Sequence, residues 1–282
     1  MTPGAGNSAR TPYLEEVSEK SASGETARIY AEIRRLSGVP MAALIYRHLA
    51  THPGALESVW KIAGPLLQGG VLQERAWKIA REAGRVQAPV LPHDIAMLND
   101  ETMQRIVGVV DAYNRANPVN FLLVSVIRAA SGVDGAASTS TPGVDWTPPP
   151  PIGQIPAIVP VEELPADVRV LVDAFAKRES EDGAVLVPTL YRHLAHWPIF
   201  LGYAHREVLP RLGAGSFQPS IEAFRSAIQR DAVVLVRENA IQADPLLHST
   251  ALQAVWTRFT GLIPELVVVG QFLHGALARR GD

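Results

Sequence analysis

The stretch Tyr46-Arg47-His48-Leu49-Ala50 returns unchanged as Tyr191-Arg192-His193-Leu194-Ala195, 145 residues further along the chain. One interval that carries several identities without a gap indicates an internal duplication, and so two copies of one structural unit. Ligand pockets concentrate where such units meet, so we expect a ligand-binding cleft at their junction. The same interval separates two further identical pairs, Pro65 with Pro210 and Gly70 with Gly215.

Length and composition agree with two globular units. The chain has 282 residues, which suits two domains of about 100–150 residues, and its hydrophobic fraction of 47% is enough for a core. The net charge of −2 gives no electrostatic reason to expect a nucleic-acid partner. The absence of cysteine excludes disulfides, thiolate nucleophiles and cysteine-based zinc sites.

Targeting and membrane signals are weak. The segment 1–9 is small and polar and lacks the basic start and apolar run of a signal peptide. The apolar run Leu262–Leu273 is interrupted by Pro264 and Glu265 and falls short of the ~20 residues that a membrane span needs. We therefore expect a cytoplasmic protein that does not enter a membrane.

A stretch rich in proline, glycine and serine separates two helical regions. It runs from about Ser131 to Val161 and contains four consecutive prolines, Pro148–Pro151. Such a stretch cannot form a helix and favours an extended conformation. We expect a helical repeat over residues 13–131, a linker over 132–160 and a second helical repeat over 161–282.

Apolar residues recur at helical spacing on both sides of the linker. The spacing predicts an all-α fold in which the two tandem repeats form an intramolecular pseudo-dimer, each burying the apolar face of the other. Val185–Val187 is a short strand candidate. The predicted helices are 25–36 with a cap at Gly38, 41–52, 100–116, a helix restarting at Asn117-Pro118 and reaching about 130, 220–239, and 246–280 with a kink or break at Pro264.

Residues with chemical potential have structural explanations beside functional ones. His48 and His52 stand four apart, a spacing that can present two metal ligands, but His193 and His196 stand three apart. The interpretation as histidines near a helix C-terminus is therefore favoured, and no metal or cofactor is expected. Arg47 and its copy could anchor a carboxylate, but a residue kept in both copies more often serves the shared fold.

Asn117 also has two interpretations. It directly precedes Pro118, and asparagine is a favoured N-cap just as proline is a favoured first helical residue. Its amide could instead hold a water molecule or a substrate oxygen. No phosphate-binding loop, dinucleotide fingerprint or nucleophile elbow is present to suggest other chemistry.

Short motifs along nearly the whole chain resemble the group I D/L-2-haloacid dehalogenases, an all-α family of two repeats. The similarity depends on the order of the motifs, since each alone is weak. They are Val39-Pro40, Arg47, Leu49-Ala50-Thr51, Pro53-Gly54, Asn114, Asn117-Pro118, Leu122-Leu123, Leu194-Ala195, Trp197-Pro198, Glu207-Val208-Leu209 and Arg258-Phe259.

The resemblance implies hydrolysis of a carbon–halogen bond in a 2-haloalkanoic acid. In that family a buried Asp takes a proton from water, and the hydroxide displaces the halide directly. Here Leu190 stands at the position of the Asp and Thr189 at that of a family Ser, while Asn117 keeps the Asn that helps to hold the water. Ile45, the equivalent in the first repeat, offers no replacement. The other expected substrate-binding positions are Met41, Leu44, Asn120 and Trp256, each differing from the family residue.

Two function hypotheses follow from the loss of the Asp. In the first, the protein is a 2-haloacid dehalogenase in which another group accepts the proton. The candidates are His48, His193 and Asp182, and a histidine is chemically suitable because it titrates near neutrality. In the second, it is a diverged relative that binds or transforms a more apolar small molecule in the same cleft. A purely structural helical repeat protein is the third interpretation. We expect a short organic acid as the small-molecule partner, and a homodimer is compatible with the sequence.

Overall fold

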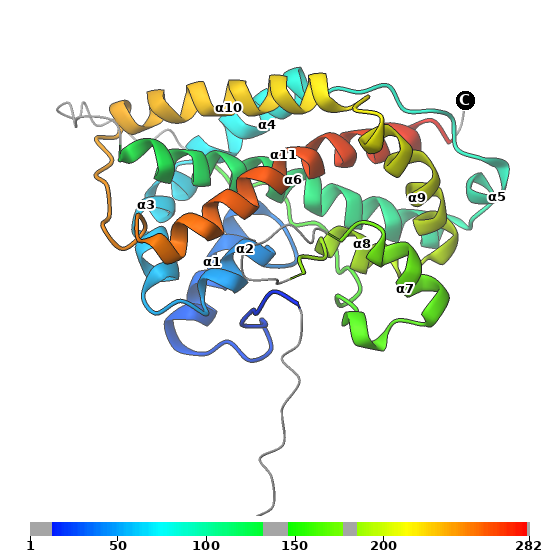
Figure 1. The fold of residues 1–282 in the computed structure, drawn as a ribbon, viewed down its shortest axis with the longest axis horizontal. Helices are drawn as coiled ribbons and strands as arrows, with labels where there is room; N and C mark the ends of the chain where they lie inside the picture. Colours follow the sequence, from blue (N-terminus) through cyan, green and yellow to red (C-terminus); the bar gives the residue numbers. More distant parts are fainter. Residues whose placement is uncertain (1–12, 132–145, 177–184, 281–282) are drawn as a thin grey trace, which may run out of the picture.

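The computed structural model describes residues 13–131, 146–176 and 185–280, and these form a helical fold (Figure 1). Within these ranges no strand occurs, so the predicted all-α class is confirmed. The strand candidate Val185–Val187 is wrong, because Val185 forms only an isolated parallel bridge with Tyr13. Among the described residues the pairing does not extend into a ladder, and α8 begins four residues later at Thr189.

The helices fall on both sides of the linker, as their spacing predicts. Before it come α1 (Gly24–Ser37), α2 (Leu44–Leu49), α3 (Ala55–Gln68), α4 (Val71–Ala83), α5 (His93–Ala96) and α6 (Asp100–Ala130). After it come the 3-10 turn η1 (Val161–Glu163), α7 (Ala166–Asp173), α8 (Thr189–Leu194), α9 (Pro198–Gly213), α10 (Gln218–Glu238) and α11 (Thr250–Ala278).

Local chemistry explains where two of these helices begin and end. Gly38 caps α1 in the left-handed conformation, with φ of 62°, as predicted. The predicted helix over 41–52 is too long, because α2 spans only Leu44–Leu49. Ala43 is extended, with ψ of 155°, and Pro53 disfavours helical backbone at the residue before it, so neither end can lengthen.

The core is built around α6 and α11, which lie side by side through the middle of the molecule (Figure 1). Each is continuous across an internal proline, Pro118 in α6 and Pro264 in α11. The predicted restart at Asn117 and the predicted break at Pro264 are therefore wrong. An interior proline removes one backbone hydrogen bond and costs about 3 kcal/mol, which the burial of the apolar residues around it offsets.

Because α6 is unbroken, Asn117 is not an N-cap. That role belongs to Asn99, whose side-chain oxygen accepts a hydrogen bond of 2.8 Å from the backbone N–H of Thr102. The Asn117 side chain is instead buried in the helix interior, with 6% of its surface exposed.

Asn114 and Gly270 mark the close approach of α6 to α11. The Asn114 Nδ2 donates to the backbone oxygen of Gly270 at 3.1 Å. A Cβ atom added at Gly270 would lie 2.2 Å from the Asn114 Oδ1, so a larger residue there would displace the Asn114 side chain. By length and composition α11 could also cross a membrane, but 67% of its most apolar window is buried inside the fold, as in a core helix.

Several features recur at the interval found in the sequence. Leu44–Leu49 and Thr189–Leu194 are separated by it at both ends. Pro65 and Pro210 lie inside α3 and α9. Gly70 and Gly215 both adopt positive φ, at 72° and 70°.

Candidate functional site

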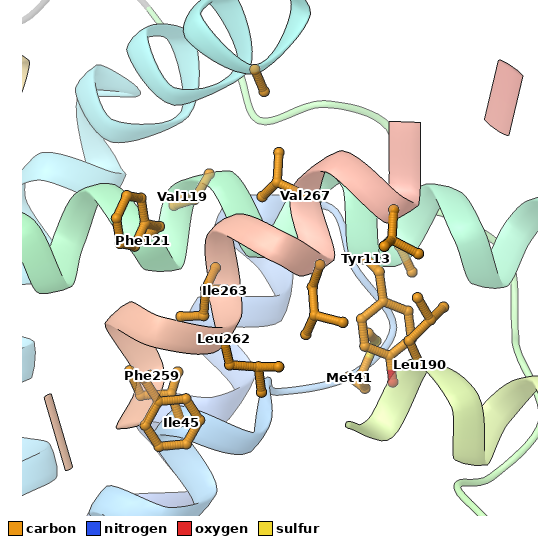
Figure 2. Packing of buried hydrophobic residues seen from close by; sticks show 14 of the residues in the cluster. Met41, Ile45, Tyr113, Val119, Phe121, Leu190, Phe259, Leu262, Ile263 and Val267 are labelled. Atoms are coloured by element: carbon orange, nitrogen blue, oxygen red, sulfur yellow. The ribbon is translucent and has the colours of Figure 1, made fainter. Parts of the chain in front are cut away.

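Leu190 lies in the core where α8 packs against α6. Its side chain has no exposed surface, and that of Met41 is 6% exposed. Figure 2 shows Leu190 and Met41 beside the ring of Tyr113, which reaches down from α6. Leu190, which stands where the related enzymes are expected to carry a base, therefore has the apolar side chain of Met41 and the phenol of Tyr113 beside it.

Tyr113 and His193 form a buried polar pair next to Leu190. The Tyr113 hydroxyl and the His193 Nδ1 are 2.8 Å apart, and the ring centroids are 5.7 Å apart. Burial lowers the pKa of His193 from 6.5 to about 3, while a hydrogen bond to the Pro156 carbonyl partly opposes the shift. His193 is thus neutral at neutral pH. The tautomer that satisfies both contacts accepts from Tyr113 at Nδ1 and donates from Nε2 to Pro156.

Tyr113 also stays neutral. Burial raises its pKa, and a hydrogen bond from Thr189, which favours the tyrosinate, lowers it only in part. Thr189 is the first residue of α8 and is itself buried. The three side chains form a hydrogen-bonded group that holds α8 against α6 and that contains no ionised base at neutral pH.

Asn117 and Asn120 follow Tyr113 on the same face of α6, one and two turns further along. Both are buried. The Asn117 Nδ2 has no hydrogen-bond partner among the described residues. A buried amide left without a partner costs about 1–3 kcal/mol, so this N–H is suited to a ligand oxygen.

Two further residues predicted for the site, Leu44 and Trp256, lie on α2 and α11. Leu44 begins α2 and is half-buried. Trp256 is fully buried on α11, and its Nε1 donates to the backbone oxygen of Leu247 at 2.7 Å. The polar edge of the Trp256 indole is therefore already satisfied within the protein.

The first copy of the repeated pentapeptide has different partners. Arg47 is 3.0 Å from a Glu16 carboxylate oxygen, and the His48 Nδ1 is 2.7 Å from the Glu15 backbone oxygen. The ring of His48 lies 6.2 Å from that of Phe259 on α11.

A cavity of about 460 Å³ is bounded by Thr51, which follows the first pentapeptide, and by Arg192 of the second. Arg192 is on its wall, and the Arg192 Nε donates to the Val159 backbone oxygen at 2.9 Å. Leu190, Asn117 and Thr189 are not among its lining residues. The cavity is lined by Tyr13, Leu14, Glu15, Glu16, Thr51, Val161, Glu162 and Arg192.

The remaining candidates are Asp182, considered as a proton acceptor, and the pair His48 and His52, considered as metal ligands. Asp182 lies outside the described residues. His48 and His52 have ring centroids 5.1 Å apart, but across 13–131, 146–176 and 185–280 no group of three His, Cys, Asp or Glu could hold a metal ion.

Sequence reasoning missed Tyr113 and Glu16. Tyr113 continues an apolar helical stripe and was expected only to pack. A tyrosine one turn before Asn117 was the signal that could have identified it.

The chain is similar to two known enzymes. It is 23% identical over 235 residues to the (R)-2-haloacid dehalogenase of Rhizobium sp. (strain NHG3), a match covering 80% of this chain and 88% of that enzyme. It is 27% identical over 207 residues to the configuration-inverting 2-haloacid dehalogenase of Alcaligenes xylosoxydans xylosoxydans, covering 70% and 69%. No protein-family model matches the chain.

Solved structures share the fold. A D-2-haloacid dehalogenase mutant in complex with D-2-CPA superimposes with a TM-score of 0.66 at 16% identity, covering 93% of this chain and 96% of that one. A D-2-haloacid dehalogenase with L-LA gives 0.54 at 18% identity, covering 95% and 93%.

Proposed function

The chain belongs to the 2-haloacid dehalogenase family, and from this premise we propose that it binds a small organic acid at the Tyr113 face of α6 without displacing halide. Leu190 carries the proposal, because its side chain is fully buried and lies beside Met41 and Tyr113. Direct displacement by water needs a proton acceptor within hydrogen-bond reach of the water. A leucine cannot be that acceptor.

The neighbouring histidine is a poor substitute. His193 contacts Tyr113 at one nitrogen and Pro156 at the other, and burial lowers its pKa to about 3. Losing a general base typically costs ~10²–10⁴-fold in rate. These contacts favour a binding role for the His193 group over proton transfer.

The proposed ligand site combines one polar donor with an apolar wall. The Asn117 Nδ2, unpartnered among the described residues, donates to a carboxylate oxygen of the acid. Met41 and Leu190, which lie beside Tyr113, supply the apolar wall proposed for its carbon chain. Because both side chains are apolar, an acid with a longer carbon chain than a two- or three-carbon haloacid fits the site better.

The proposal also includes an internal duplication of the fold. We take residues 13–131 and 161–282 as two repeats forming a pseudo-dimer, joined by 132–160. The recurrence of α2 and α8 at one interval, and the positive φ at Gly70 and Gly215, support this division. A cytoplasmic location and a homodimer remain parts of the same proposal.

Halide release from the two enantiomers of 2-chloropropionate tests the missing reaction. We expect the wild-type protein to release no halide above a buffer blank, and Leu190→Asp to gain release. Leu190→Asn is the matched control, since it has the same shape without a proton-accepting carboxylate. Circular dichroism verifies that each variant folds. Halide release by the wild-type protein would contradict the proposal and favour a dehalogenase with a replacement base.

A thermal-shift series tests the binding step. Hexanoate is expected to raise the melting temperature of the wild-type protein more than acetate does, because its longer chain buries more apolar surface. Asn117→Leu is expected to abolish both shifts. Equal shifts in wild type and variant would show that the acids bind elsewhere.

A further inference from the structure

A second cavity lies on the other side of α6 from the site described above. Its volume is about 390 Å³, and its walls come from α4, α6, α11 and Pro149. This is within the ~300–1,000 Å³ range typical of small-ligand sites. The side chains that decide its chemistry are Trp77, Arg81, Asp111, Asn114, Arg115 and His274.

Helix geometry separates the two sites. Asp111 and Arg115 are four residues apart on α6 and share one face, while Tyr113 and Asn117 share another. At about 100° per residue, these two faces point in nearly opposite directions. A ligand in the second cavity therefore does not depend on the function proposed for the Tyr113 face.

Two guanidinium groups reach the second cavity with donors to spare. The Arg115 Nη1 bonds the backbone oxygens of Gly38 at 3.2 Å and Pro150 at 2.7 Å, which fixes the side chain. Both hydrogen bonds that the described residues accept from this side chain come from Nη1, which leaves Nε and Nη2 available among the five N–H donors of the guanidinium. Arg81 is exposed and has no ion pair within the described part of the chain.

The acidic group of the cavity already has a partner. Asp111 Oδ1 lies 3.4 Å from His274 Nε2. Two arginines face this one carboxylate, so the balance of charge favours an anion over a cation.

An aromatic wall completes the site. The Trp77 Nε1 donates to the Arg115 backbone oxygen at 2.9 Å, so the indole is held in place and its polar edge is satisfied. Ala80 and Pro149 add apolar surface. A fixed flat ring beside two guanidinium groups suits a planar ligand with an apolar body and a charged end.

We propose that this cavity binds a small aromatic carboxylate. Its carboxylate accepts hydrogen bonds from Arg81 and Arg115, and its ring packs against Trp77. The guanidinium groups bind the charge, and the indole selects the flat body over a spherical oxyanion.

Calorimetric titration of the full-length protein with benzoate tests the proposal. We expect saturable binding of benzoate, roughly tenfold weaker binding in Arg81→Gln because one charged hydrogen bond is lost, and tighter binding in Asp111→Asn because a repelling charge is removed. Lys78→Gln is the matched control, since Lys78 is an exposed cation of the same helix outside the cavity, and it is expected to bind as wild type does.

Two further probes test the charge and the aromatic ring of the ligand separately. Benzamide keeps the ring without the charge, and inorganic phosphate keeps the charge without the ring, so both are expected to bind much more weakly than benzoate. No benzoate binding up to about 10 mM, equal weakening by Arg81→Gln and Lys78→Gln, or phosphate binding as tight as that of benzoate would each overturn the proposal.

Discussion

The helices α2 and α8 carry the same four residues, Tyr-Arg-His-Leu, yet their side chains have different partners. His48 contacts the Glu15 backbone oxygen and faces Phe259, whereas His193 meets the Tyr113 hydroxyl. The aromatic ring that faces each histidine differs. Phe259 of α11 faces His48, and Tyr113 of α6 faces His193. Both copies therefore contain buried polar side chains, and the hydroxyl of Tyr113 gives His193 a side-chain partner where His48 has a backbone oxygen.

The largest expected effect concerns the packing beneath α8. Leu190→Ala removes a fully buried side chain and is expected to lower the free energy of unfolding by about 2–5 kcal/mol, through lost burial and the cavity left behind. Urea denaturation measures it. Val170→Ala is the control, because Val170 is 68% exposed and its truncation should cost little. A small effect at Leu190 would mean that α8 does not pack on α6 as described.

Protonation of His193 gives the next effect. Its folded pKa of about 3 lies below its ordinary 6.5, so the unfolded chain binds more protons between these values. Stability contributed by neutral His193 is complete above about pH 6.5 and is lost as the pH falls toward 3, with a slope on the order of 1.4 kcal/mol per pH unit.

Denaturation at several pH values checks this dependence. His193→Gln is expected to flatten the loss of stability relative to the wild-type protein. Tyr113→Phe should keep the slope, because burial, the main cause of the shift, remains. Identical slopes in wild type and His193→Gln would refute the burial of a neutral imidazole.

The arginines of the two copies are expected to differ in a smaller way. Arg47→Met leaves the Glu16 carboxylate without its cation and should cost about 2 kcal/mol, since the Arg47 side chain is only 6% exposed. Arg192→Met loses one hydrogen bond to Val159 and should cost about 1 kcal/mol. Thermal unfolding of both variants measures the difference, and a reversed order would argue against the Glu16 pairing.

The smallest effect tests the hydroxyl itself. Tyr113→Phe makes the second copy resemble the first, and we expect a loss of about 1 kcal/mol because the His193 Nδ1 loses its donor. Phe259→Tyr is the converse change, which adds a hydroxyl on the ring that faces His48, and we expect it to change stability by less than Tyr113→Phe does. Equal responses to the two substitutions would remove the distinction between the copies.

The fold was largely predictable, because helical periodicity is a local signal. It located α1, α10 and α11 and covered α6 with two predicted helices, and Gly38 ends α1 as expected. The continuity of α6 through Pro118 was not predictable, since the local cost of proline is visible in the sequence whereas the burial that offsets it depends on α11 and α10.

The candidate site was predictable in part. Met41, Thr189 and Leu190, which the family resemblance implies for the site, lie near Tyr113, which it did not imply, and Trp256 is buried on α11. Tyr113 and His193 are 80 residues apart, so no spacing rule could connect them.

What could be known from the order of residues alone is the all-helical class, the interval linking the two pentapeptides, and the lack of an acidic residue between Gly183 and Glu207. Folding in three dimensions added which histidine meets a tyrosine, which amide lacks a partner and where the arginines converge. The reason is that periodicity reports contacts within one helix, a few residues apart, whereas the chemistry of a buried side chain depends on neighbours from distant helices.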